Sequence, residues 1–380
     1  MLPGRAVVTS VVRGATLREP SGWLRVVDLA ERRVQASTPV PDSALRRRDP
    51  NPRGGLRGAT GVSADDGRLV VAGTDALFVL DHRWALVDRL THPWLGGVHG
   101  ILAEPDAIWA TCTSADLLLA LGWRGEVLDS WCWRADSALR QELGFDGLRG
   151  FDPDRDYRDP LTTGGSFNVA HVNAVARAPE GLVVSLGRLL ARRALRRQRM
   201  EGVMVRVAEQ TNPGRSALRA VRRRREGRYP GRPRGERPPS ESQHAVVALE
   251  RANSGWSARV IMRATDTAVP NHDALVDGDR LLYTDSNTSR LVAIDRHTGS
   301  EMAAVGIPGS PPFARGVVQL AGESFLVGSQ CPAAIHGVDM AAGLVMDGIV
   351  LSDDPRETVF AIALVPDLFT PPGRDLTLTP

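Results

Sequence analysis

His272-Asp-Ala-Leu-Val276, Arg280-Leu-Leu-Tyr-Thr284 and Arg290-Leu-Val-Ala-Ile-Asp295 decide the fold, because the chain repeats the unit that they form. Each copy opens with a basic residue and continues with an apolar strand, a polar turn and a second apolar strand. The copies begin at Arg57, His99, His171, His272 and Arg315. The first two starts are 42 residues apart, and strand repeats of about 40–45 residues are typical of β-propeller blades.

The two ends of the chain supply a further blade. The N-terminal region offers three strand patterns at residues 6–12, 23–29 and 33–36, and the C-terminal region offers one at residues 358–365. Pairing the C-terminal strand beside the N-terminal three would close the ring and cover otherwise exposed sheet edges. The sequence therefore predicts an all-β fold, a six-bladed β-propeller closed by its N- and C-terminal segments in one blade, as a single domain over residues 1–380.

Two long steps between repeats indicate insertions, one over residues 134–166 and one over residues 188–243. The second is Arg-rich, with 17 Arg and 4 Glu between residues 188 and 238, while the rest of the chain is net acidic. Composition of this kind predicts partial disorder. It also predicts weak, nonspecific binding of polyanions such as nucleic acid, although a solvated basic loop would have the same composition.

The sequence predicts a cytoplasmic protein without a membrane span. No stretch of about 18 apolar residues occurs, and the N-terminus lacks the long apolar stretch of a signal peptide. The three cysteines, Cys112, Cys132 and Cys331, are an odd number without the spacing of a metal motif. Thiols of this kind are typical of a reducing compartment.

Residues 284–295, Thr-Asp-Ser-Asn-Thr-Ser-Arg-Leu-Val-Ala-Ile-Asp, resemble the blade signature of the NHL, gluconolactonase and strictosidine synthase-like six-bladed propellers. Residues 171–175, 269–275, 285–288, 312–318 and 327–330 together are most similar to an uncharacterised bacterial propeller family. The resemblance covers roughly residues 55–335 and implies the fold. The carboxylate and asparagine ligands of the gluconolactonase metal site have no match here, so that activity is not implied.

The basic residues that open the repeats form the candidate site. Each should lie where an inner strand begins, beside the central channel, on the face that also carries both insertions. Three imidazoles, His99, His171 and His272, could bind one divalent transition metal ion and leave a position open for a substrate. Arg57 and Arg315 would bind an anionic group. Asn173 and Asp273, close behind two of the histidines, could support the metal ligands or contact the substrate.

Two classes of function follow from this arrangement. The first is a metal-dependent lyase, hydrolase or oxidoreductase that acts on a small anionic metabolite, with no residue yet assigned to catalysis. The second is a non-catalytic propeller that binds a ligand or a protein through the funnel face and the basic insertion. The same His and Arg side chains could also line a wet channel for structural reasons alone. Because propellers host many functions, the fold does not choose between these alternatives.

Overall fold

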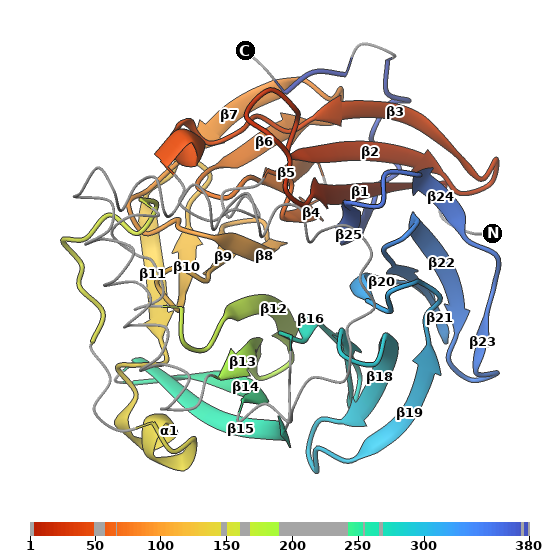
Figure 1. The fold of residues 1–380 in the computed structure, drawn as a ribbon. Coiled ribbons are helices and arrows are strands. Elements are labelled where there is room, and N and C mark those ends of the chain that lie inside the picture. The colour runs from red at the N-terminus through yellow and green to blue at the C-terminus, as the bar shows by residue number, and fades with distance from the viewer. Residues whose placement is uncertain are drawn as a thin grey trace, which may run out of the picture.

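The computed structural model describes residues 4–48, 58–65, 67–145, 150–159, 168–189, 242–253, 255–265, 269–373 and 376–378. Over these residues the chain forms six antiparallel sheets around a central channel, which confirms the predicted six-bladed propeller (Figure 1). The channel lies where the six inner strands face one another. We call the face on which the inner strands begin the entry face.

The first blade contains both ends of the chain, and its strands, inner first, are β25 (Glu357–Leu364), β1 (Arg5–Val12), β2 (Gly22–Asp28) and β3 (Arg33–Pro39). The second and third blades are β4 (Gly61–Asp65), β5 (Arg68–Ala72), β6 (Leu77–Asp81) and β7 (Leu86–Leu90), then β8 (Val98–Ala103), β9 (Ile108–Cys112), β10 (Leu117–Leu121) and β11 (Val127–Cys132).

The fourth and fifth blades are β12 (Val172–Ala178), β13 (Gly181–Leu189), β14 (Gln243–Ala252) and β15 (Gly255–Thr265), then β16 (His272–Asp277), β17 (Arg280–Asp285), β18 (Arg290–Asp295) and β19 (Glu301–Gly306). The sixth blade is β20 (Arg315–Ala321), β21 (Ser324–Gly328), β22 (Ala333–Asp339) and β23 (Leu344–Val345), and β24 (Ile349–Ser352) also pairs with β22.

The core lies between neighbouring blades, and the middle strands show this in their sequences. All five residues of β9 and of β10 are buried, and β10 reads Leu-Leu-Leu-Ala-Leu. A strand packed on both faces needs apolar side chains in both directions, which explains why these strands are continuous apolar runs. The outer strand β7 has three consecutive exposed residues instead. The apolar packing of the middle strands against neighbouring blades therefore fixes each blade in the ring.

A buried ion pair reinforces the closure of the ring. Strand β25 pairs with β1 from Ala6 opposite Leu364 to Val12 opposite Glu357. The carboxylate of Glu357 accepts hydrogen bonds from the Arg25 guanidinium and from the Ser10 hydroxyl, and both side chains of the ion pair are almost fully buried. The two ends of the chain are therefore joined by backbone pairing and by a desolvated charge pair.

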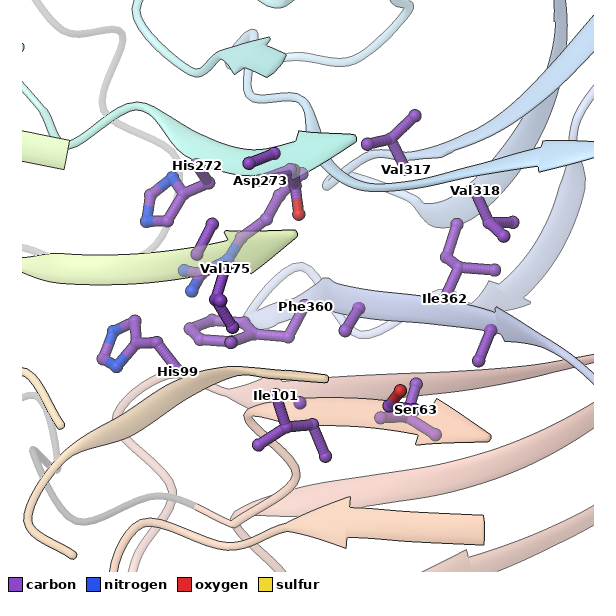
Figure 2. Close-up of a pocket in the computed structure, with 18 of the residues that line it drawn as sticks. Ser63, His99, Ile101, Val175, His272, Asp273, Val317, Val318, Phe360 and Ile362 are labelled. Carbon is purple, nitrogen blue, oxygen red and sulfur yellow. The ribbon is translucent and has the colours of Figure 1, made fainter. Parts of the chain in front are cut away.

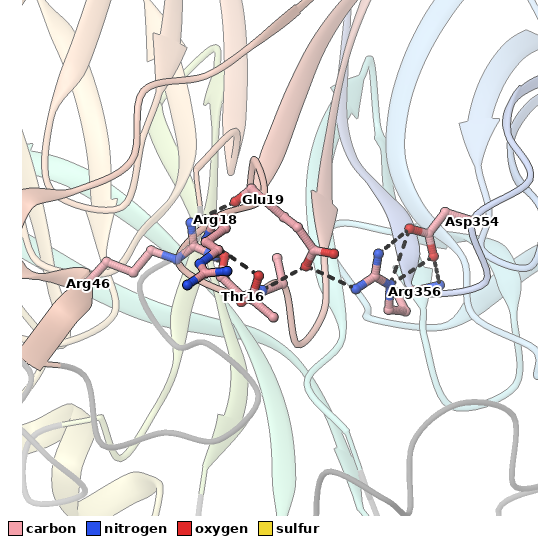
Figure 3. A network of polar contacts seen from close by, with 7 residues as sticks. Thr16, Arg18, Glu19, Arg46, Asp354 and Arg356 are labelled. Atoms are coloured by element: carbon pink, nitrogen blue, oxygen red, sulfur yellow. Dashed lines mark hydrogen bonds and ion pairs between the residues drawn. The ribbon is translucent and has the colours of Figure 1, made fainter.

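A second polar network holds the β1–β2 connection on the entry face (Figure 3). Arg46, in the short 3₁₀ helix Ala44–Arg48, donates to the backbone carbonyls of Ala15, Thr16 and Glu19. Arg356 then joins Glu19 to Asp354, at 3.2 Å and 2.8 Å respectively. The connection is thus tied to the segment that leads into β25, and its first residue, Arg13, is held at the mouth of the channel by a backbone hydrogen bond to Arg356.

Each insertion is described in part. Within 134–166, a short helix α1 (Ser137–Glu142) is capped by the Asp136 carboxylate, and the backbone N–H of Tyr157 donates to Pro93 in the loop that leads into β8. Most of the Arg-rich insertion and the whole of Arg57 lie outside the described residues. In the described part of the chain, no helix has both the length and the apolar character needed to span a bilayer.

Candidate functional site

A local irregularity begins the inner strand of four consecutive blades. The pairing of β8, β12, β16 and β20 with their neighbours shifts register near their first residues. A bulge at a strand end turns a side chain away from the regular alternation and is common beside binding sites. His171 and Asp273 also have positive φ values of 51° and 63°. The local backbone is therefore specialised where the repeats begin.

The three predicted histidines come together at the entry end of the channel. The ring centres of His99 and His171 are 4.7 Å apart, and those of His171 and His272 are 6.1 Å apart. Their ring planes are nearly perpendicular, at 79° and 84°. We call these residues the histidine cluster. Three consecutive blades thus supply adjacent imidazoles from positions far apart in the sequence.

Each imidazole of the histidine cluster is held through its Nδ1 atom. His99 Nδ1 lies 2.8 Å from the Gly97 carbonyl oxygen, and His171 Nδ1 lies 3.2 Å from Asn168 Oδ1. Both partners are acceptors, so both Nδ1 atoms carry the proton and donate. The ring partner of His99 is thus a backbone carbonyl, and that of His171 is a side-chain amide.

The tautomer of His272 follows from the hydroxyl beside it. His272 Nδ1 lies 2.8 Å from Ser286 Oγ, whose own proton is donated to the Ala314 carbonyl at 3.0 Å. The hydroxyl oxygen must then accept from His272, which places the ring proton on Nδ1. All three rings therefore carry the basic lone pair on Nε2, and an acceptor that fixes Nδ1 is typical of histidines that bind metal ions through Nε2.

Two of the rings are held in the neutral state. Burial lowers the pKa of His171 well below its ordinary value, with a further lowering from His99, Arg188 and Arg315. Burial likewise lowers the pKa of His272, helped by the charge of Arg315. Neutral imidazole is the form that binds a metal ion or accepts a proton. These two rings therefore need not lose a proton before they bind a metal ion or accept a proton at neutral pH.

Asp116 positions His171, a role that no pattern in the sequence indicated. Its fully buried carboxylate accepts hydrogen bonds from the backbone N–H groups of Val169, Ala170 and His171 at 2.7, 3.0 and 3.1 Å. The Arg134 guanidinium completes the arrangement at 2.7 Å. The turn between β9 and β10 thus fixes the start of β12 in the next blade.

Arg315 lies at the same end of the channel on an aromatic platform. Its guanidinium carbon is 3.1 Å from the centre of the Phe360 ring, and the ring centre of His99 is 5.8 Å from that of Phe360. Two further arginines also act electrostatically on the cluster: Arg188 lowers the pKa of His171 and Arg13 lowers that of His272. The mouth of the channel is therefore electropositive and suited to an anion.

The two predicted polar neighbours of the histidines have partners of their own. The Asp273 carboxylate accepts hydrogen bonds from Thr284 Oγ1 at 2.5 Å and from the Gly316 N–H at 2.9 Å. Asn173 Nδ2 donates to the Asn271 carbonyl at 2.6 Å, and its buried Oδ1 has no partner among the described residues. The ring Nδ1 bonds described above go to Gly97, Asn168 and Ser286. The roles expected of Asn173 and Asp273 toward a substrate or a metal ligand stay predictions.

A cavity of about 280 Å³ continues from the histidine cluster along the channel (Figure 2). His99, His272, Asp273, Arg315 and Asn173 contribute to its lining, together with residues from all six inner strands. In Figure 2, His99 and His272 lie at one end of the view, and Val318, Ile362 and Ser63 lie at the other. The predicted residues that the structure describes therefore share one site. Arg57 cannot be placed in it.

The described flanks of both insertions lie beside this site. The N–H groups of Gly187 and Arg188, at the end of β13, donate to the carbonyls of His171 and Ala170, both at 3.1 Å. The loop before β8, which leads to His99, carries the contact with Tyr157. The chain thus enters the Arg-rich insertion directly beside His171. In the described part of the chain, no group of three or more His, Cys, Asp or Glu side chains is arranged to hold a metal ion as it stands.

A fourth histidine, His244, contacts Asn271, the residue before His272, and predicts a pH dependence of stability. It is fully buried, with Nε2 at 3.3 Å from Ser185 Oγ and Nδ1 at 3.2 Å from Asn271 Nδ2. Burial lowers the pKa of His244 to about 4. The folded pKa lies below the unfolded value, so between about pH 6.5 and about pH 4 the unfolded state binds a proton that the folded state does not. The free energy of unfolding therefore falls by about 1.4 kcal/mol per pH unit in this range, and it is not affected by this group above pH 6.5.

We therefore expect the melting temperature to fall between pH 6.5 and 4.5 more steeply in the natural protein than in His244→Gln. The matched control is His297→Gln, because the side chain of His297 is 56% exposed, and it should keep the natural slope. Equal slopes in all three proteins would contradict a buried neutral imidazole at position 244.

Comparisons with solved structures show a likeness in fold. No family model matches the sequence, and no curated protein matches it. Among solved structures, a chain of the nidogen/laminin complex matches with a TM-score of 0.52 and 10% identity, covering 94% of this chain and 97% of that chain. A protein of unknown function from Bacteroides caccae matches with the same score and identity, over 95% and 98%. A streptogramin B lyase matches at 0.44 and 9% identity, over 79% and 71%.

Proposed function

We propose that the histidine cluster binds one divalent transition metal ion and that the site acts on a small anionic molecule. The observation that carries the proposal is the common tautomer of the three rings, each with Nδ1 donating to a protein acceptor and Nε2 as the basic atom. Imidazole nitrogens bind Zn²⁺ at about 2.0–2.1 Å, so the ring centres of ligands sharing one ion lie roughly 5 Å apart. The distances of 4.7 and 6.1 Å bracket that value.

Binding requires the rings to turn from their edge-to-face contacts so that the three Nε2 atoms converge. The ion would shift the rings toward this converged arrangement by binding it more tightly than the edge-to-face arrangement. The surrounding arginines would repel an isolated cation but would favour an ion accompanied by an anionic substrate. This charge balance supports a site that uses metal and anion together.

We propose a lyase or hydrolase as the class of enzyme. A metal ion in this position would supply Lewis-acid chemistry toward an oxygen atom of the substrate. Arg315, stacked on Phe360, would orient the anionic group, because a planar guanidinium suits a carboxylate. Asp273 would limit the negative charge that the site accepts. We also propose a cytoplasmic location, for which the three free cysteines are the support.

The proposal predicts stabilisation by metal. A ligand at 100 times its Kd stabilises the folded state by about 2.7 kcal/mol, which corresponds to a rise of about 3 °C in the melting temperature of a chain this long. We expect Zn²⁺, Mn²⁺ or Fe²⁺, added one at a time to chelator-treated protein, to produce that rise, and His171→Ala to abolish it. The control His336→Ala lies outside the cluster and should keep it. A rise that survives in His171→Ala would contradict the proposed site.

A metal-free anion site is the second candidate, and the electropositive mouth favours it. Arg13, Arg188 and Arg315 all act on the histidines, and such a rim could bind an anion alone. This candidate predicts that small anions stabilise the protein equally with and without chelator. The metal-dependent site predicts a larger effect of anions once metal is present.

A further inference from the structure

We propose that the natural ligand is a small monocarboxylate with an apolar tail, whose head lies at Arg315 and whose tail lies along the channel toward Val318. The inference deepens the proposed function, because it rests on an anion at the entry end, and it adds the chemical class of the molecule. It does not require that a metal ion be bound. The geometry points to it through three features of the cavity.

The first feature is the separation of polar and apolar lining. The polar side chains that line the cavity at its entry end are His99, Asn173, His272, Asp273 and Arg315. Apolar side chains line the part beyond them: in Figure 2, Val317, Val318 and Ile362 lie at the end of the view away from the histidines. Ala64 and Leu364, toward the ends of β4 and β25, also line the cavity. Ser63 is a hydroxyl in this part, and its Oγ accepts a hydrogen bond from the Ala103 N–H at 2.9 Å. The polar side chains are therefore concentrated at one end of the cavity, which suits a ligand with one polar end.

The second feature is the charge of the head position. Arg315 offers a planar, permanently charged group, and its stacking on Phe360 sets the orientation of that plane. The Asp273 carboxylate lines the same end of the cavity and interacts electrostatically with Arg315. A dianion would be repelled by Asp273 more strongly than a monoanion. The pairing of one arginine with a nearby carboxylate favours a carboxylate head over a phosphate.

The third feature is the size of the cavity. Its volume of about 280 Å³ is at the lower end of small-molecule pockets. An apolar cavity of about 150 Å³ binds benzene, so this cavity has room for on the order of ten non-hydrogen atoms. That is a carboxylate with a short alkyl chain or one ring. A larger amphiphile would extend out of the channel.

The test is a chain-length series on the full-length protein, as purified and after chelator treatment. We would measure the affinity of straight-chain monocarboxylates from acetate to decanoate by calorimetry, with alcohols and alkyl phosphates of equal length alongside. We expect affinity to rise about fourfold per added methylene, as burial of apolar surface predicts, and then to stop rising when the channel is full. Alcohols and phosphates should bind at least tenfold more weakly than the carboxylate of equal length.

Two variants locate the tail. Ala64→Leu narrows the apolar part of the channel and should move the optimum to a chain about three carbons shorter. Ala321→Leu makes the same change on an exposed residue outside the cavity, and it should leave the optimum unchanged. A third variant, Arg315→Gln, tests the head position. It should remove the preference for the carboxylate over the alcohol and leave the chain-length dependence unchanged.

The outcomes separate this inference from the proposed function. Carboxylate binding without chain-length dependence, tighter binding of phosphates, equal binding of alcohols, or no binding at any length would each overturn the inference. The metal-dependent stabilisation described above would be unaffected by any of these results. If metal binding failed but the chain-length series succeeded, the proposed enzyme would be wrong and the carboxylate site would stand.

Discussion

Asp116→Ala is expected to destabilise the folded protein by about 3–5 kcal/mol, because it breaks a buried ion pair and leaves the Arg134 charge without its carboxylate. Both side chains are essentially excluded from solvent. The substitution also removes the acceptor for three backbone N–H groups at the start of β12. A loss of this size corresponds to a fall of about 5 °C in melting temperature if the propeller unfolds as one unit.

The same substitution should also impair the site, because His171 depends on Asp116 for its backbone position. We expect metal-dependent stabilisation to be lost in Asp116→Ala at temperatures where the protein remains folded. Asp116→Asn should be intermediate in stability, since the amide oxygen still accepts but carries no charge. The control Asp279→Ala removes a carboxylate that is 78% exposed and paired with His297, and it should cost less than about 1 kcal/mol. Equal melting temperatures for Asp116→Ala and the control would contradict the role of Asp116.

Glu357→Ala is expected to have an effect of similar size, about 3–5 kcal/mol, at the closure of the ring. The Glu357 side chain is 2% exposed and it neutralises the buried Arg25, while Ser10 also donates to it. Without the carboxylate, the guanidinium lies buried beside the pairing of β25 with β1. The first blade should therefore separate more readily than the others.

Hydrogen exchange distinguishes this local effect from general destabilisation. We expect the amides of β25 and β1 to lose protection first in Glu357→Ala, before those of β9 and β10. The control Glu301→Ala removes a carboxylate that is 50% exposed and 3.4 Å from Arg290, and it should leave both melting temperature and exchange unchanged. Uniform loss of protection in all six blades would argue against a special role of this pair in closure.

Much of the fold could be predicted from the sequence, because each blade buries its middle strands on both faces and so leaves apolar runs at a regular spacing. Leu117–Leu121 and Leu291–Ile294 are readable in this way, and so is the C-terminal strand that completes the first blade. The extra strand β24, which reads Ile-Val-Leu-Ser, was missed because a four-stranded blade has no place for a fifth strand. The placement of Arg57 stays a prediction.

The site was predicted only in part, and the reason is physical. Basic residues at the repeat starts indicated a gathering of His99, His171 and His272, which the structure shows. Asp116 was missed, because the backbone N–H groups that it holds lie more than 50 residues away along the chain and a single aspartate in a turn has no distinctive pattern. Phe360 was missed for a related reason: the register shift that frees it from regular pairing with β1 depends on the closed ring. Such roles arise from tertiary contacts between blades.

The most direct measurement is the metal content of the purified full-length protein beside the variant in which His99, His171 and His272 are all replaced by alanine. The account predicts close to one transition metal ion per natural chain after supplementation, and almost none in the variant, with circular dichroism showing that the variant is still folded. Equal metal content in the two proteins, or none in the natural protein after supplementation, would contradict the metal site.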